Sequence, residues 1–145
     1  MIAIVQDSID VAAVLRSVSS NSAGATVLFL GTVRDHGDEG AVLGLYYEAY
    51  QEMAEEVLRS IAQQAIGRWN LLGLSVVHRL GNLAVGEVSV AIAASAEHRV
   101  EAFEACRYVI DAIKKSVPVW KKEISAAGSM WVEGVLLEDN PDGYV

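Results

Sequence analysis

The sequence has a single cysteine and no long apolar run, and each scarcity excludes a class of protein. With Cys106 as the only cysteine among 145 residues, no internal disulfide can form, so a reducing cytoplasm is the expected compartment. No apolar run approaches the roughly 18 residues of a membrane helix. The apolar start reaches Asp7 too soon for a signal peptide. We therefore expect a soluble cytoplasmic protein with no membrane partner.

Basic side chains are also scarce, with 11 Lys and Arg against 19 Asp and Glu and a formal net charge of -8. Nucleic acids and anionic membranes require a basic face, so neither is expected as a partner. All the lysines nevertheless lie in the segment KKSVPVWKKE, at positions 114, 115, 121 and 122. Any anionic ligand must be bound by such a local cluster. The mean hydropathy of +0.31 is high for a small domain and suggests apolar surface covered by a partner or a second copy.

The hydrophobic pattern predicts one α+β domain over residues 1–145. Helices are expected at residues 9–18, capped by Asp7 or Ser8, and at 52–69 and 97–115. Strands are expected at 2–5, 25–33, 42–50, 74–81, 87–96, 119–124 and 131–135, with RDHGDEG (34–40) as a polar connection and GNLAVG (81–86) as a turn. Because strands follow one another in pairs, a mixed or largely antiparallel sheet with about three helices is favoured.

The helix at 97–115 has a sharply defined apolar face. At 100° per residue its apolar arc is centred on Cys106 and comprises Val109, Ala102, Ile113, Cys106, Val117, Ile110 and Phe103. Lys114 borders this arc, whereas Lys115 points to water. A reactive thiol needs a partly exposed, electropositive site, so Cys106 is interpreted as a buried core residue.

Two further groups of basic residues could bind an anion. His98 and Arg99 lie in the first turn of that helix, where free backbone N–H groups disfavour cations unless an anion is bound. The alternative to an anion site is that both are solvated surface residues. Beyond Pro118, strand alternation puts Lys121 and Lys122 on opposite faces. Alternation does not tell which of the two faces the cleft beside Lys114.

Several familiar site motifs are missing. Neither GxxxxGK[ST] nor GxGxxG occurs, and the loop with Arg34 and His36 is a weak phosphate-loop signal. The histidines His36, His78 and His98 have no metal-type spacing, so we expect neither a metal nor a bound cofactor. His78 is interpreted as a strand residue with a structural hydrogen bond.

Five segments together closely resemble the large, catalytic subunit of molybdopterin synthase. They are GTVR (31–34), YEAY followed by MA (47–54), HRLGNLAVGEVSV (78–90), the block from His98 to Glu123, and WVEG (131–134). The resemblance implies an α/β-hammerhead-type fold and a sulfurtransferase of molybdenum cofactor biosynthesis. It implies that a small ubiquitin-like sulfur-carrier subunit inserts a C-terminal thiocarboxylate, whose sulfur passes to cyclic pyranopterin monophosphate. It also implies a heterotetramer built on a central dimer of this chain.

The resemblance also assigns roles to residues. The family's essential lysines match Lys114 and Lys121, its anion-binding arginine matches Arg34, and its His-Arg pair matches His98 and Arg99. Lys114 and Lys121 are therefore expected to be catalytic, and all five to bind substrate. The segment after Gly134 carries no assignment. Two alternatives remain: a non-catalytic dimeric module that docks a ubiquitin-like carrier, and a sulfurtransferase that uses Cys106.

Overall fold

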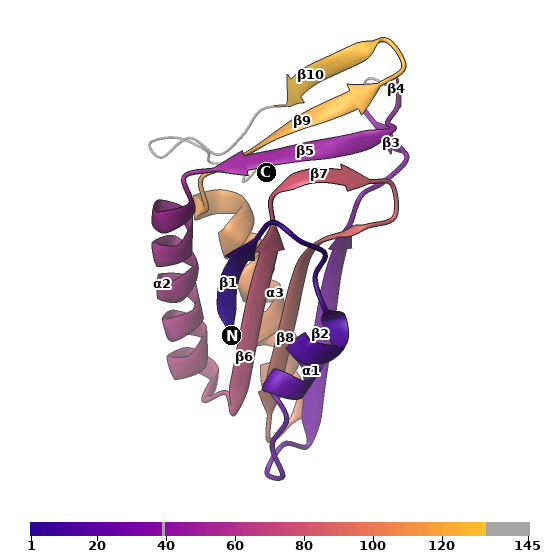
Figure 1. Ribbon diagram of the computed structural model, residues 1–145. Helices are drawn as coiled ribbons and strands as arrows, with labels where there is room; N and C mark the ends of the chain where they lie inside the picture. Colours follow the sequence, from indigo (N-terminus) through magenta and orange to yellow (C-terminus); the bar gives the residue numbers. More distant parts are fainter. Residues whose placement is uncertain (39, 133–145) are drawn as a thin grey trace.

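The computed structural model describes residues 1–38 and 40–132 and is built around a four-stranded sheet (Figure 1). The strand order is β1-β6-β8-β2, with bounds Ile2–Val5, Gly73–Arg79, Val88–Ala96 and Ala25–Thr32. β1 runs parallel to β6, whereas the pairs β6–β8 and β8–β2 are antiparallel. The expected α+β class with a mixed, largely antiparallel sheet is confirmed.

Three helices of the described residues cover the two faces of this sheet (Figure 1). α1 (Val11–Ser17) packs on one face, and α2 (Gln51–Trp69) and α3 (Arg99–Ser116) pack side by side on the other. Strand alternation supplies both cores: Val76 and Ile92 join the large core with α2 and α3, whereas Val77 and Ala93 join the small core under α1. None of the described helices is long and apolar enough to cross a membrane.

A second four-stranded sheet lies across one end of the first, at the top of Figure 1. Its order is β10-β9-β5-β7, with bounds Gly128–Val132, Val119–Ser125, Gly44–Ala49 and Gly81–Ala84. The prediction that residues 81–86 form only a turn was wrong, because residues 81–84 pair with β5. The polar connection contains a small hairpin, β3 (His36–Gly37) with β4 (Gly40–Ala41).

Three expectations about the helices need correction. α1 begins at Val11 and is capped by Asp10, not by Asp7 or Ser8, because the Asp10 carboxylate accepts the Ala13 N–H at 3.0 Å. α3 begins at Arg99, with His98 at its N-cap position. Phe103 is 61% exposed and not part of the core. It lies beside β2, the last strand of the main sheet within residues 1–38 and 40–132.

The end of α3 brings the chain directly into the second sheet. The Val117 N–H donates to the Ile113 carbonyl at 3.1 Å and closes the last turn, and Pro118 follows. β9 then begins at Val119, one residue later than the proline. The last strand, β10, starts at Gly128, three residues before the predicted start. Residues 133–135 of the predicted strand and the segment after Gly134 lie outside the described residues.

Candidate functional site

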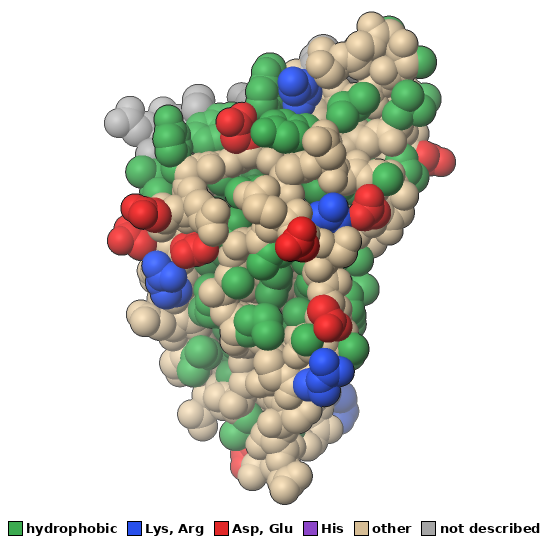
Figure 2. All heavy atoms as spheres, viewed as in Figure 1, with side chains coloured by type: hydrophobic (Ala, Val, Ile, Leu, Met, Phe, Trp, Pro, Cys, Tyr) green, Lys and Arg blue, Asp and Glu red, His purple; other side chains and the backbone are tan. Residues whose placement is uncertain are grey.

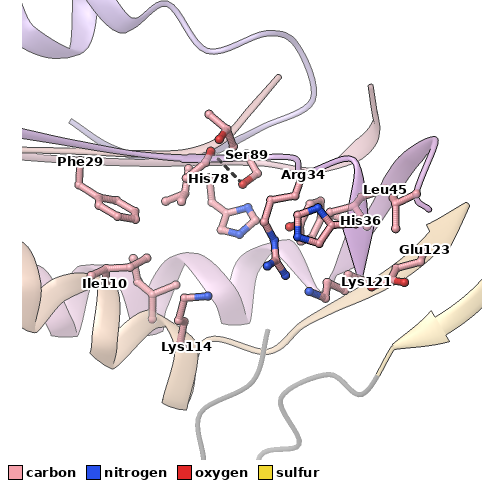
Figure 3. Close-up of a pocket in the computed structure, with 16 residues that line it drawn as sticks. Phe29, Arg34, His36, Leu45, His78, Ser89, Ile110, Lys114, Lys121 and Glu123 are labelled. Carbon is pink, nitrogen blue, oxygen red and sulfur yellow. Dashed lines mark hydrogen bonds between the residues drawn. The ribbon is translucent and has the colours of Figure 1, made fainter. Parts of the chain in front are cut away.

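A pocket of about 240 Å³ lies where the two sheets meet the C-terminal end of α3 (Figure 3). The main sheet contributes the ends of β2, β6 and β8, the second sheet contributes β5 and β9, and α3 contributes its last turns. Three basic side chains line it: Arg34 from the loop after β2, Lys114 from α3 and Lys121 from β9. The structure therefore brings together three of the five predicted site residues.

Pairing between β5 and β9 decides which strand lysine faces the pocket. Lys121 is paired with Tyr47 and Lys122 with Tyr46, so neighbouring pairs point to opposite faces of this sheet. Tyr47 and Lys121 line the pocket. Lys122 lies on the other face, with its Nζ 5.8 Å from the Tyr46 ring centroid and 5.0 Å from that of Trp131. Its ammonium is held by cation–π contacts instead.

The helical lysines divide in the same way. Ile110, Ile113 and Lys114 all line the pocket, because residues three and four apart share one face of α3. Lys115, the next residue, is exposed and does not line it. The predicted division between Lys114 at the border of the apolar face and Lys115 in water is confirmed.

The three cations act on one another. Burial lowers the pKa of Lys121 from its ordinary 10.5, and the charges of Lys114 and Arg34 lower it further, while Glu123 and Asp38 oppose them. On the face shown in Figure 2, acidic and basic side chains are interspersed without a continuous basic patch. The positive charge at the pocket is thus a local feature that an anionic ligand would stabilise.

The other two predicted residues lie elsewhere in the same chain. His98 and Arg99 are exposed at the start of α3, and Lys114 lies near its end. Fifteen residues of α-helix separate Arg99 from Lys114 by about 22 Å. The structure of one chain does not bring His98 and Arg99 to the pocket.

Sequence reasoning missed a neutral polar wall at the back of the pocket, formed by Tyr47, His78 and Ser89. The Ser89 hydroxyl donates to the Gly31 carbonyl at 3.2 Å (Figure 3). Burial raises the pKa of the Tyr47 hydroxyl, an effect that Ser89 partly offsets. Strand pairing places these residues together, because Tyr47 pairs with Gly81, three residues after His78, and His78 pairs with Val90, the neighbour of Ser89. No motif in the sequence signals this wall.

His78 itself is 3% exposed, and its Nδ1 lies 3.0 Å from the Arg79 carbonyl oxygen. The predicted structural hydrogen bond of this strand residue is confirmed. Its ring meets that of Tyr47 edge-on, with centroids 5.3 Å apart. Burial lowers its pKa from 6.5 to about 4, with a smaller contribution in the same direction from the charge of Lys114. The imidazole is therefore neutral at physiological pH.

Cys106 lies outside the pocket wall, in the apolar core. It is 4% exposed, and burial raises the pKa of its thiol to about 11. The predicted buried core cysteine is confirmed. Among residues 1–38 and 40–132, no group of three or more His, Cys, Asp or Glu side chains is arranged to hold a metal ion. The chemistry available in the pocket is that of lysine, arginine, the Glu123 carboxylate, the imidazoles of His36 and His78, and neutral hydroxyl groups.

The fold and the pocket define a small α+β protein with a pocket lined by two lysines and an arginine. The MoaE protein family model matches residues 4–116. The molybdopterin synthase catalytic subunit of Pyrococcus abyssi is 46% identical over 117 residues, which cover 81% of this chain and 79% of the relative. The chain belongs to the MoaE protein family. The activity of this family is that of a molybdopterin synthase catalytic subunit, a sulfurtransferase of molybdenum cofactor biosynthesis.

Solved structures agree with this assignment. The crystal structure of molybdopterin synthase from Staphylococcus aureus matches with a TM-score of 0.87 and 37% identity, covering 91% of this chain and 96% of that one. A complex of subunits 1 and 2 of the molybdopterin-converting factor from Helicobacter pylori 26695 includes a chain that matches with a TM-score of 0.75. That chain is 21% identical, and the match covers 90% of this chain and 89% of that one, so it shows the fold alone.

Proposed function

We propose that this chain transfers sulfur from the C-terminal thiocarboxylate of a small ubiquitin-like carrier subunit to cyclic pyranopterin monophosphate, forming the dithiolene of molybdopterin. One observation carries the proposal: Lys114, Lys121 and Arg34 line a single pocket in a chain of net charge -8. A thiocarboxylate sulfur is already a good nucleophile, so the pocket needs groups that hold anions and transfer protons. The buried, protonated thiol of Cys106 is not required. The single cysteine also supports a cytoplasmic location.

Lys114 and Lys121 have different roles in the proposed reaction because they differ in burial. Lys114 is exposed at the rim, where an incoming carrier tail first meets the pocket; it contacts the terminal carbonyl and serves as acid/base or transient nucleophile. Lys121 is half-buried, and its lowered pKa makes proton release easier than from an exposed lysine. Together with Arg34 it binds the phosphate and the charge that develops as the cyclic ester opens.

A groove between β2 and α3 supplies a route for the carrier tail. Three residues of β2 line it opposite four of α3: Val27, Leu28 and Phe29 face Phe103, Cys106, Arg107 and Ile110. Phe29 and Ile110 also line the cationic pocket, so the groove leads into it. β2 is the edge strand of the main sheet, and an extended tail can pair with such an edge. A thiocarboxylate at the end of that tail would meet Lys114.

His98 and Arg99 act in this scheme as phosphate ligands supplied by a second copy of the chain. Their position about 22 Å along α3 from Lys114 prevents them from reaching the pocket of their own chain. A dimer resolves this geometry, since a two-fold related copy can present the start of its α3 to the neighbouring pocket. This arrangement accounts for two cationic side chains at a helix N-terminus, where an anion stabilises them.

The decisive experiment replaces Lys114 with alanine and supplies a thiocarboxylated carrier and the cyclic precursor. We expect Lys114→Ala to capture the carrier and to form no dithiolene product, because the rim cation that meets the carbonyl is lost. Lys115→Ala is the matched control, since it removes an adjacent exposed lysine that does not line the pocket, and its turnover should equal that of the parent. Turnover retained by Lys114→Ala would refute the role of Lys114, whereas a parent chain that captures the carrier and forms no dithiolene would support a non-catalytic docking module.

Mixing two inactive variants tests the contribution of the second copy. If His98 acts in the neighbour's pocket, combining Lys114→Ala with His98→Ala chains creates hybrid dimers in which one of the two pockets is intact. Random pairing of equal amounts predicts recovery of about one quarter of the parent activity. No recovery, with hybrid dimers demonstrated by native mass spectrometry, would show that His98 acts in its own chain, and a fully active His98→Ala variant would show that it has no role.

A further inference from the structure

His78 and Tyr47 are buried titratable side chains of the pocket wall to which the sulfur-transfer scheme gives no role, and His78 is the more deeply buried of the two. It comes from β6 in the centre of the main sheet and lies behind Arg34, opposite Lys114 (Figure 3). At 3% exposure it can reach only a molecule that enters the pocket.

The hydrogen bond of His78 determines which ring nitrogen can accept a proton. A backbone carbonyl only accepts hydrogen bonds, so the nitrogen 3.0 Å from the Arg79 oxygen, Nδ1, must carry the proton. In a neutral imidazole the other nitrogen, Nε2, is then an acceptor. Burial holds the ring neutral down to a pH of about 4, and protonation would add another cation beside Lys114. The pocket therefore contains an acceptor whose polarity does not change over the physiological range.

This acceptor complements the remaining polar groups. Lys114, Lys121 and Arg34 present donors only and suit any phosphate, whatever the rest of the molecule is. Selection among phosphates therefore depends on the groups of the pocket that can accept a hydrogen bond, which are the Glu123 carboxylate, the Thr32 hydroxyl and the neutral wall at the back. The Ser89 hydroxyl already donates to the Gly31 carbonyl, which leaves its oxygen, like Nε2, as an acceptor.

We propose that His78 is a specificity-determining residue of this site, whose Nε2 accepts a hydrogen bond from an N–H of the substrate's nitrogen heterocycle. The inference rests on the proposed function, since a pterin presents N–H donors on its fused rings while its phosphate is bound by the cations. A ligand without such a donor leaves a buried acceptor unsatisfied, which reduces affinity about 10- to 100-fold. Inorganic phosphate, which contacts only the cations, should not depend on His78.

The test compares His78→Leu, which removes the acceptor, with His78→Gln, whose side-chain oxygen can replace Nε2. Equilibrium binding of the cyclic precursor and of inorganic phosphate is measured for each, with thermal unfolding to confirm folding. We expect His78→Leu to weaken precursor binding about 10- to 100-fold and phosphate binding by less than about twofold, and His78→Gln to restore most of the loss. An unchanged precursor affinity, or equal losses for both ligands, would overturn the proposal.

A measurement on the parent protein keeps the proposal testable if His78→Leu fails to fold. In a ¹⁵N-histidine NMR spectrum, the Nε2 resonance of His78 should move when the precursor binds and stay in place when inorganic phosphate binds. A resonance that responds to neither ligand, or a parent protein that binds no precursor, contradicts the proposal. The binding test and the sulfur-transfer test can fail independently. Precursor binding that depends on His78, without dithiolene formation, would refute only the proposed function. Dithiolene formation by a fully active His78→Leu variant would refute only this inference.

Discussion

The neutral state of His78 has a measurable consequence for the pH dependence of folding. Its pKa is about 4 in the folded chain and near the ordinary 6.5 when unfolded. Between these values the unfolded chain binds a proton that the folded chain does not, so the free energy of unfolding falls as the pH falls. This contribution is complete above the unfolded pKa and is lost as the pH approaches about 4.

The size of the effect follows from the shift. Integrating the linkage relation from pH 7 to about pH 4.5 gives a loss of about 2.5 kcal/mol from His78 alone. Other groups with lowered pKa values, such as Asp35 and Glu87, also titrate in acid. They are present in any His78 variant, so their contributions cancel when the parent and a variant are compared.

The assay is urea unfolding of the parent and of His78→Gln at several pH values. Glutamine does not titrate, and any packing change against Tyr47 shifts its stability by an amount independent of pH. The difference in unfolding free energy between the two proteins should therefore change by about 2.5 kcal/mol between pH 7 and about pH 4.5, to the disadvantage of the parent. Parallel pH profiles would refute the reasoning, since they would mean that the imidazole titrates normally in the folded chain.

Two further predictions concern the core and the backbone. Cys106→Ala should keep full turnover in the dithiolene assay and lose about 1 kcal/mol of stability. The reason is that a buried thiol with a raised pKa contributes to packing and not to the chemistry. Lost turnover in a folded variant would instead support a cysteine-based mechanism. Gly24→Ala should destabilise by about 1–3 kcal/mol, because its Cβ would clash with the Glu97 carbonyl oxygen. Its matched control is Gly67→Ala in α2, which meets no atom within 4 Å and should stabilise by up to about 1 kcal/mol; thermal unfolding of both variants reports the contrast.

Local patterns predicted the elements well, and their failures have a common cause. The expected spans for β1, α2 and α3 were within two residues of those observed, because long amphipathic periods and the stop at Pro118 act along the chain itself. The prediction failed for β7, which is too short and polar to be recognised alone. It is a strand only because β5 offers an edge to pair with.

The site shows the same division. Composition and helix periodicity indicated by themselves that Lys114 borders an apolar face, that Lys115 is solvated and that Cys106 is buried, since these properties depend on one helix. Tertiary structure decided that Lys121 and not Lys122 faces the pocket on its strand, because the register with Tyr47 and Tyr46 is a property of two strands.

Tertiary structure alone also revealed the neutral wall and the separation of His98 and Arg99 from the pocket. His78 acquires its fixed acceptor because the sheet buries it beside the end of α3, more than thirty residues further along the chain. Sequence by itself determined which residues of this protein are chemically capable of binding an anion and on which faces of their elements they lie. Which of them meet was decided by packing between elements distant in the chain, because burial and charge at a site depend on neighbours in space.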